Sequence, residues 1–554
     1  MSRARTGRDR GAPELACTLL ACAALASAAF ASSSARARTG TGDPAEIFRD
    51  KDPDADLVLH GQLRLRSAAY VNLDLDRGPS PTDGAPLFGP ASSSAPALFG
   101  HDARARFSPS FFIGDDLRVF LDVDLFTASL GIAPSGIPSG AQAAGADGVA
   151  AALLDVRALG FDWLLPVGVL SVGRMPSHFA LGIAANDGAA IDDDGGDRAD
   201  RIAFVAPVFG HLAAVAVDAL DPDGRTRWSE SSSTSWSSVG EPRGAVAIGE
   251  QAVSLAFMKW RAPWEVELYR DAGRAVFDYG AALSCEWESK GAPGLWQLAV
   301  PPSPDAPVVR RDARFVVVDA WTRLVWDRFR IEGEAFASDL VVANPSTIPG
   351  VIVRRPIAGN PAAFALIAEL RALDPKSDAL VLQLETGAAS ADPAPGFPFA
   401  STSSSAFSGA QPGDVFGPQV ALGKRGDARF DAARIHPLHR VDLILWRTLL
   451  GGVSEAAYAR ASVEGAPVDH LRLDAHVVYS HAISPDSAPG GVGPLGVELD
   501  LGAEAFVDAD GHRASLRLDA GNLVPLGGLA ARGGRPTSVS SWGQMVLVRL
   551  AYAL

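Results

Sequence analysis

The sequence predicts an all-β fold, an antiparallel transmembrane β-barrel of about 18 strands (range about 16–20) with long extracellular loops. Two observations predict this class. Segments in which apolar and polar residues alternate recur along most of the 554 residues. Beyond the first 31 residues, no segment offers the run of about 18 apolar residues that a transmembrane helix needs. Because only helices and closed barrels satisfy their backbone hydrogen bonds within a bilayer, alternating strands without such a helix favour a barrel.

The first alternating run extends from Leu57 to Asp76. Alternate side chains of a strand point to opposite faces. One face holds Leu57, Leu59, Gly61, Leu63, Leu65, Ala69, Val71, Leu73 and Leu75, and the other holds His60, Gln62, Arg64, Arg66, Asn72, Asp74 and Asp76. Soluble strands usually have about 5–6 residues and membrane-spanning strands need about 9–11, so the length favours a membrane strand. A soluble β-helix or sandwich is the rival fold, and it predicts protein that is extractable without detergent.

Later runs repeat the pattern and lead to the end of the chain. They are Leu117–Leu125, Phe329–Ala335, Leu380–Glu385, Leu471–Tyr479, Leu495–Leu501 and Ala514–Asp519. In the final run, Val546, Val548, Leu550, Tyr552 and Leu554 share one face. A chain that ends within an amphipathic strand suits the closing strand of a barrel. This run also resembles the C-terminal assembly signal of outer-membrane proteins, which implies the barrel-assembly machinery as a partner, although Leu554 replaces the usual terminal aromatic.

The N-terminus divides the chain into three parts. Residues 1–31 combine a basic start with an apolar, Ala-rich stretch and small-x-small sites, as in a secretory signal peptide. Residues 32–56 read as a periplasmic linker, and residues 57–554 as the barrel. Lipoprotein cleavage before Cys22 is the alternative. After either cleavage, Cys285 lies in an alternating run, and we interpret it as a wall residue rather than a nucleophile.

The regions between the runs suggest loops and membrane interfaces. The long irregular stretches, expected to be extracellular loops, are 77–101, 128–150, 219–244 and 386–432, and the residues Ala509-Asp510-Gly511 suggest a short periplasmic hairpin. Tryptophans lie at many run ends, which predicts aromatic girdles. They are Trp163, Trp228, Trp260, Trp264, Trp287, Trp296, Trp321, Trp326, Trp446 and Trp542. The net charge of −15 argues against a nucleic-acid partner.

Two polar stretches invite a metal hypothesis. Asp187, Asp192, Asp194 and Asp197 lie in an acidic segment and are weak Ca²⁺ candidates, although the spacing does not fit an EF-hand. We favour a solvated acidic loop that pairs internally with Arg198 and Arg201. His436 and His439, close to Asp442, allow zinc, but we favour a loop with scattered histidines. We therefore expect no metal and no cofactor.

Four stretches carry a resemblance to a known family. They are Gly173–Gly188 followed by Asp197–Arg201, Gly61–Pro81, Ala388–Phe397 and Arg440–Tyr458. Together they resemble a deltaproteobacterial family of uncharacterised porin-like outer-membrane proteins, and they spread over most of the mature chain. That family has cysteines in the acidic segment, whereas Ala190–Asp194 has none here. The resemblance implies a membrane barrel but no substrate and no catalytic residues.

These observations predict a porin-like channel for small solutes in the outer membrane of a Gram-negative bacterium, in contact with lipid and able to form oligomers. Charged residues on the polar strand faces would line a water-filled lumen and create a transverse field. The lumen-lining candidates are Arg64, Arg66, Arg118, Asp122, Asp124, Arg157, Arg330, Glu332 and Glu334. No motif for catalysis is present, and adjacent Ser177 and His178 would point to opposite strand faces, so we expect no enzyme. The alternatives are a non-conducting barrel that anchors a surface or envelope assembly and, less favoured, a barrel hydrolase.

Overall fold

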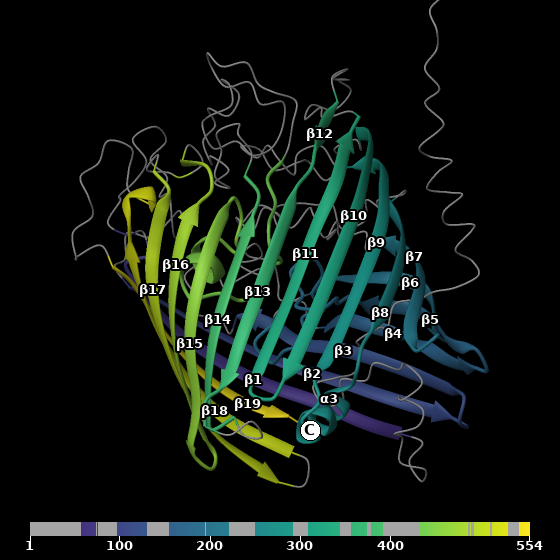
Figure 1. Cartoon of the computed structure of the whole chain (residues 1–554), viewed down its shortest axis with the longest axis horizontal. Coiled ribbons are helices and arrows are strands. Elements are labelled where there is room, and N and C mark those ends of the chain that lie inside the picture. The colour runs from purple at the N-terminus through teal and green to yellow at the C-terminus, as the bar shows by residue number, and fades with distance from the viewer. Residues whose placement is uncertain are drawn as a thin grey trace, which may run out of the picture.

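The computed structural model of the chain is a closed antiparallel β-barrel (Figure 1). It describes residues 57–73, 75, 97–129, 154–193, 196–220, 250–291, 309–343, 356–373, 378–391, 431–485, 488, 492–509, 512–529 and 542–553. The strands are β1 (Leu57–Val71), β2 (Ala97–Ile113), β3 (Leu117–Ser129), β4 (Leu154–Leu165), β5 (Gly168–Pro176), β6 (Arg198–Val208), β7 (His211–Leu220), β8 (Glu250–Lys259), β9 (Val276–Gly291), β10 (Val309–Trp326), β11 (Phe329–Val342), β12 (Ile357–Gly359), β13 (Ala362–Arg371), β14 (Leu380–Ala389), β15 (Ala456–Val468), β16 (Leu471–Ala482), β17 (Pro494–Ala509), β18 (His512–Pro525) and β19 (Gly543–Ala553). Each strand pairs with its neighbours in the sequence, and the last pairs with the first.

The ring has 18 positions, which confirms the predicted strand number. β12 and β13 both pair with β11, β12 along its last residues and β13 along its first. They occupy one position because Pro361, just before β13, has no backbone N–H to continue the ladder. Its carbonyl still accepts a hydrogen bond of 2.9 Å from the Ser338 N–H, so the β11 edge stays satisfied.

The closing contact is the one that the final sequence run predicts. β19 pairs with β1 in a register from Gln62 opposite Ala553 to Val71 opposite Gln544. β1 also pairs along its length with β2, so neither of its edges is left open. Closure removes the unpaired backbone groups that would be costly in lipid.

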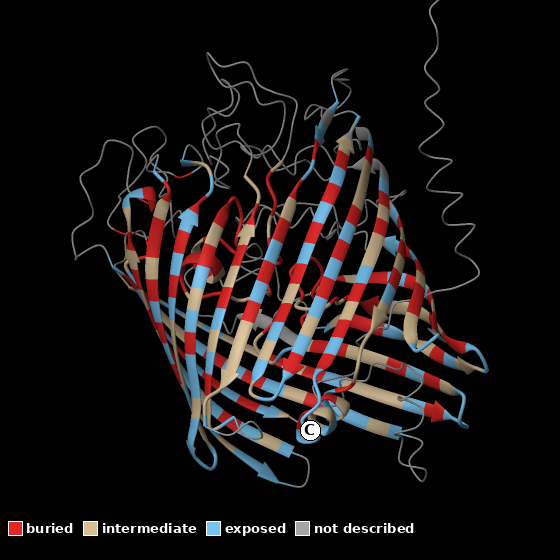
Figure 2. Ribbon diagram, viewed as in Figure 1, coloured by how far each residue is buried: buried red, intermediate tan, exposed pale blue. Residues whose placement is uncertain are grey.

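Burial alternates along the strands, as the striping in Figure 2 shows. On β1, Leu63 is 46% exposed on the outer face, whereas Arg64 is 2% exposed on the inner face. One expectation was wrong: the strand ends at Val71, and Leu73 and Leu75 do not continue its apolar outer face. Both are buried against the interior, 4% and 1% exposed, because the chain turns inward at Asn72, whose φ is 56°.

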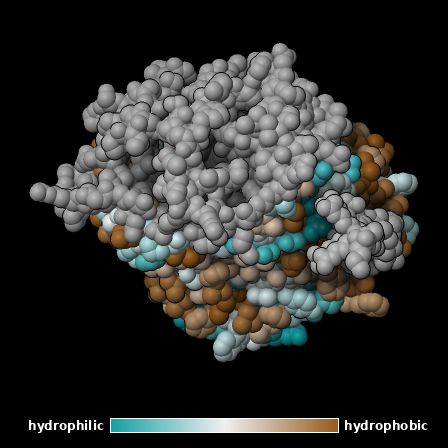
Figure 3. Space-filling model, turned by 90° about the horizontal axis from the view of Figure 1, so that it is seen from above, coloured by the Kyte–Doolittle hydropathy of each residue, from teal (hydrophilic) through white to brown (hydrophobic). Residues whose placement is uncertain are grey.

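The outer wall is apolar. Figure 3 shows hydrophobic residues over the part of the wall seen in that view. Large apolar side chains on β19 and its neighbours are about half exposed, such as Leu550 at 52% and Leu516 at 52%. The girdle prediction holds only in part: Trp326 is 58% exposed, but Trp321 and Trp446 are buried, at 3% and 2%, because both pack inside the barrel. Trp228 and Trp296 lie outside the described residues.

The two ends of the barrel differ. At one end, short turns join strands, as between β10 and β11. At the same end β17 and β18 pair as far as Ala509 opposite His512, which agrees with the short hairpin predicted there. At this end α3 (Pro263–Asp271) connects β8 to β9, and its Glu267 pairs with Arg371 of β13 at 3.2 Å. Within the described residues, no helix is long and apolar enough to span a membrane.

The connections at the other end contain most of the predicted loops. The strands extend further than expected here: β2 begins at Ala97 and β14 continues to Ala389, within the stretches 77–101 and 386–432. Most of these connections lie outside the described residues, as do residues 1–56, so the long loops, the signal peptide and the linker stay predictions. Cys285 lies on β9 beside Trp287, on the outward-facing positions.

Candidate functional site in the barrel interior

Two connections from the loop end fold into the barrel. The first, here called the inner loop (177–197), joins β5 to β6, and its residues 194 and 195 are not described. The second, the inner segment (431–455), precedes β15. The inner loop contacts inward-facing side chains of β1, β2, β4 and β11 at once, which places it across the lumen.

Wall arginines hold the inner loop on one side. Arg64 donates to the Ile191 carbonyl at 3.1 Å, and Arg66 to the Asp192 carbonyl at 3.0 Å. Three further arginines donate to backbone carbonyls of the loop: Arg104 to Ile191, Arg106 to Gly188, and Arg157 to Asp187 and Gly188. Arg549 binds the Asp192 carboxylate instead. Guanidinium groups suit this role because they offer several donors in a fixed plane.

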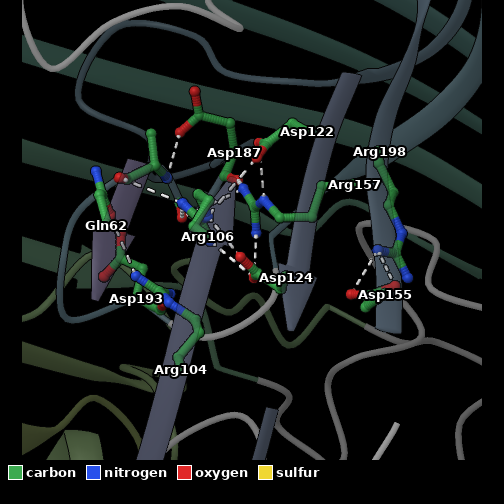
Figure 4. A network of polar contacts seen from close by, with 12 residues as sticks. Gln62, Arg104, Arg106, Asp122, Asp124, Asp155, Arg157, Asp187, Asp193 and Arg198 are labelled. Atoms are coloured by element: carbon green, nitrogen blue, oxygen red, sulfur yellow. Dashed lines mark hydrogen bonds and ion pairs between the residues drawn. The ribbon is translucent and has the colours of Figure 1, made fainter. Parts of the chain in front are cut away.

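Wall aspartates hold these arginines in place (Figure 4). Arg106 pairs with Asp124 through two contacts of 2.7 and 3.0 Å, and Arg157 pairs with Asp122 at 3.2 Å. Asp102 of β2 does the same for Arg64 and Arg66 of β1. Buried charges need such partners, since leaving one unpaired is costly. The arginines therefore serve two partners, a wall carboxylate and the backbone of the inner loop.

A carboxylate holds the inner loop on the opposite wall. Glu334 of β11, halfway around the ring from β2, accepts hydrogen bonds from three backbone N–H groups. The donors are Leu181 at 2.6 Å, Ile183 at 3.4 Å and Ala184 at 3.3 Å. Arginines thus bind loop carbonyls on one side and a glutamate binds loop N–H groups on the other. This is a transverse arrangement of charge across the lumen.

The interpretation of a solvated acidic loop is wrong. Asp187, Asp193 and Asp197 are 5–6% exposed, because the inner loop is packed inside the wall. The two arginines that were expected to pair within the segment contact wall carboxylates, Arg198 with Asp155 of β4 and Arg201 with Asp218 of β7.

The inner loop also satisfies its own backbone. Asp197 N–H donates to the Asn186 carbonyl at 2.7 Å, and the Asp197 carboxylate accepts from Asn186 N–H at 3.1 Å. Gly196, with φ of 125°, lies against Asp187, and a Cβ there would be 2.2 Å from the Asp187 carbonyl oxygen. Among the described residues no group of three or more metal-ligating side chains converges, and Asp194 lies outside them. Asp192 binds Arg549 rather than gathering with other carboxylates.

The inner segment supplies much of the interior core. Ile435, Ile444, Leu445 and Trp446 are at most 2% exposed and pack with wall residues of β1, β16, β18 and β19. Trp446 Nε1 donates to Ser480 Oγ of β16 at 2.9 Å. The segment includes a π-helical turn, Leu445–Leu449. This apolar content explains why a connection near a Gly- and Ser-rich stretch folds inward.

Two histidines join the inner segment to the inner loop. His436 N–H donates to the Ile183 carbonyl at 2.8 Å, and His436 Nε2 lies 3.6 Å from an Asp197 oxygen. His439 Nε2 lies 2.9 Å from Glu385 of β14, and its Nδ1 lies 3.3 Å from the Leu181 carbonyl. The two histidines lie in an irregular connection, as expected, but that connection is packed inside the barrel and both side chains make contacts there.

The remaining candidates lie on the inner wall. Arg118 of β3 forms a buried pair of 3.0 Å with Asp162 of β4, and Glu332 accepts from Trp321 Nε1 at 2.8 Å. Arg330 is 32% exposed and lies 3.3 Å from Glu369 of β13. The sequence patterns did not identify the two inner connections. The signal that could have found the inner segment is the apolar-rich stretch 441–450, which follows no strand-like alternation.

Two carboxylates of the inner connections have shifted pKa values. Burial alone would raise the pKa of Asp192, but the neighbouring Arg549 and Arg440 outweigh it and lower the pKa below its usual range. Burial, with the nearby Asp500, raises the pKa of Asp442 to about 7, although two backbone N–H groups oppose this. The inner loop is thus held by an ionised carboxylate, and the inner segment favours a protonated one.

Comparisons with known proteins return solved barrels at low identity. The chain is similar to OccK9 (OpdG) of Pseudomonas aeruginosa, with 10% identity over 90% of this chain and 98% of that chain and a TM-score of 0.44. It is also similar to an anion-selective porin from Comamonas acidovorans, with 9% identity, coverage of 90% and 99%, and a TM-score of 0.37. OmpT, an outer membrane protein of Vibrio cholerae, gives 11% identity, coverage of 90% and 97%, and a TM-score of 0.35. No family model matches the chain, and the comparison with curated proteins gives no match.

The closed ladder of paired strands, rather than these likenesses, establishes the barrel. With its apolar outer wall and charged inner wall, the chain is a transmembrane β-barrel of the outer-membrane type.

Proposed function

We propose that the chain is a porin-like channel for passive diffusion of small solutes, narrowed at mid-height by the inner loop and the inner segment. The observation that carries the proposal is the charged inner wall towards the short-turn end. There Arg330 and Arg513 are each 32% exposed and Arg517 is 22% exposed, although all three point inward. Inward-facing charges that keep contact with water indicate an aqueous vestibule.

The vestibule carries both signs of charge in close pairs. Arg517 contacts Asp474 at 2.9 Å and Asp519 at 2.7 Å, and Glu504 lies 2.9 Å from Arg549. Paired charges order water and screen solutes by size and charge. Of the lumen-lining candidates, Arg330 belongs to this vestibule. Seven others are at most 8% exposed, namely Arg64, Arg66, Arg118, Asp124, Arg157, Glu332 and Glu334. Contact of any candidate, Asp122 included, with a solute stays a prediction.

Liposome swelling with solutes of graded size tests the proposal. Purified barrel, folded in detergent and inserted in vesicles, should let small solutes enter and exclude larger ones. Swelling no faster than in protein-free vesicles, with barrel that still migrates as folded protein before heating, would contradict it.

A non-conducting anchor is the second candidate, and a specific observation favours it. Phe179 of the inner loop packs in one cluster with the inner-wall residues Ala203, Ala216 and Ala256, each at most 4% exposed. We further infer a transport rather than a catalytic role, because Ser177 and His178 contact other groups than each other. Ser177 Oγ accepts a hydrogen bond from Arg201 at 2.8 Å, and His178 Nε2 lies 3.1 Å from the Ala180 carbonyl oxygen. Contact with the assembly machinery and oligomer formation stay predictions.

A further inference from the structure

The inner segment is held to the wall by carboxylates rather than by arginines. Glu498 of β17 accepts backbone hydrogen bonds from Leu443 at 3.0 Å, Ile444 at 2.6 Å and Leu445 at 3.0 Å. Asp442, at the start of the same stretch, accepts from the N–H groups of Trp446 at 2.9 Å and Arg447 at 3.1 Å. The backbone N–H groups of five consecutive residues, 443–447, therefore depend on two acidic side chains.

A third carboxylate completes the group. Asp500 occupies the next inward-facing position of β17 and shares a hydrogen bond with Glu498. Asp442, Glu498 and Asp500 are 5%, 1% and 3% exposed. Asp442 Oδ2 and Asp500 Oδ1 find no hydrogen-bond partner among the described residues. Three buried carboxylates in contact cannot all ionise cheaply, so the cluster keeps a proton and titrates as a unit.

The charges that face the cluster offset this repulsion only in part. Arg460 of β15 is a wall cation that favours the ionised form of Asp442, but it is shared, because it lies 3.4 Å from Glu385 and 3.2 Å from the ring of His476 on β16. His476 faces Asp500 and bonds to Asp474 at 3.0 Å. Arg447, in the inner segment itself, interacts electrostatically with Asp192 and Tyr70. None of these cations is dedicated to the three acids.

We propose that Asp442, Glu498 and Asp500 form a proton-sensitive latch, which retains the inner segment when protonated and releases it, widening the channel, as the pH rises. The inference rests on the proposed channel function and adds its regulation. The sign follows from linkage: an acid whose pKa is raised on folding stabilises the folded arrangement fully below its unfolded value of about 3.9. That contribution is lost as the pH rises through the value of about 7 that burial and Asp500 give to Asp442.

The inner loop does not share this response. Its contacts join arginines to carbonyls and to Asp192, whose pKa is lowered by Arg549 and Arg440 against the effect of burial. These contacts stay intact as the pH rises and weaken only in acid. The inner segment is therefore the element that alkaline pH should move, and the inner loop should stay in place.

Single-channel recording across pH 5.5 to 9 tests the latch. The open fraction of the wild-type channel should rise through neutral pH, by up to about tenfold per pH unit for each proton released. Asp442→Asn and Asp500→Asn each imitate a protonated acid, so both should stay in the low-pH state at every pH. Glu498→Ala removes the acceptor of three N–H groups and should open already at low pH. Asp155→Asn, at a wall carboxylate of β4 that pairs with Arg198 at 2.8 Å and is not one of the lumen candidates, is the matched control and should respond like wild type.

The outcomes separate the latch from the channel itself. An open fraction that does not change with pH, or an alkaline rise that survives in Asp442→Asn and Asp500→Asn, would overturn the latch. Two independent Asn variants keep the test decisive if one fails to fold, which the heat-dependent shift in electrophoretic migration reveals. Absence of current at every pH, even after residues 436–452 are replaced by a short Gly-Ser linker, would instead contradict the proposed channel.

Discussion

Removing the Glu334 carboxylate should release one side of the inner loop. Glu334→Ala leaves three N–H groups without their acceptor, and two of them belong to buried residues, Ile183 at 0% and Ala184 at 7% exposed. An unsatisfied buried donor costs about 1–3 kcal/mol, so the change should cost about 2–6 kcal/mol. Because whole domains are stable by only about 5–15 kcal/mol, this is enough to displace a loop. The barrel should remain, since its strand ladder is untouched.

Single-channel conductance and amide hydrogen exchange provide the assay for this variant. We expect a larger conductance step and faster exchange in residues 177–193, while migration of the folded barrel is unchanged. Glu332→Ala is the matched control, because Glu332 lies two residues away on the same face of β11 and bonds to Trp321 rather than to the loop. Wild-type conductance and exchange in a folded Glu334→Ala barrel would refute the role assigned to Glu334.

Three further predictions concern the wall and the loop. Arg201→Met leaves Asp218 as an uncompensated buried charge, both side chains being 2% exposed, so the barrel should lose about 3–5 kcal/mol in chemical denaturation, and Arg201→Met with Asp218→Leu should lose less. Gly196→Ala places a Cβ 2.2 Å from the Asp187 carbonyl oxygen and should speed hydrogen exchange in the inner loop without changing barrel stability. Val548→Arg, on the lipid-facing side of β19, should cost about 2–4 kcal/mol near the bilayer centre, measured by folding into lipid vesicles.

The barrel itself could be predicted from sequence because its signal is local. Each strand alternates with a period of two, so β1 and β19 are recognisable in the sequence before their pairing is known. The strand number follows from counting such runs. Even so, Leu73 and Leu75 continue the apolar alternation of β1 in the sequence but lie outside the strand, because the chain turns at Asn72.

The interior could not be predicted because it depends on contacts far apart in sequence. Arg64 meets Ile191 and Glu498 meets Leu443, and neither pair has a spacing that a periodic pattern reveals. The inward-facing positions of Arg64 and Glu334 follow from alternation. Their partners, however, are backbone groups of the inner loop. In the sequence this loop is recognisable only as an acidic segment, and an acidic segment is expected to be solvated.

The most direct test of the central claim is the single-channel current of the wild-type barrel in a planar bilayer, with a salt gradient to give ion selectivity. We expect stepwise currents, and steps that become larger when the inner segment is removed, because it narrows the water-filled path. Silence from correctly folded protein, both with and without the inner segment, would contradict the channel and favour the non-conducting anchor.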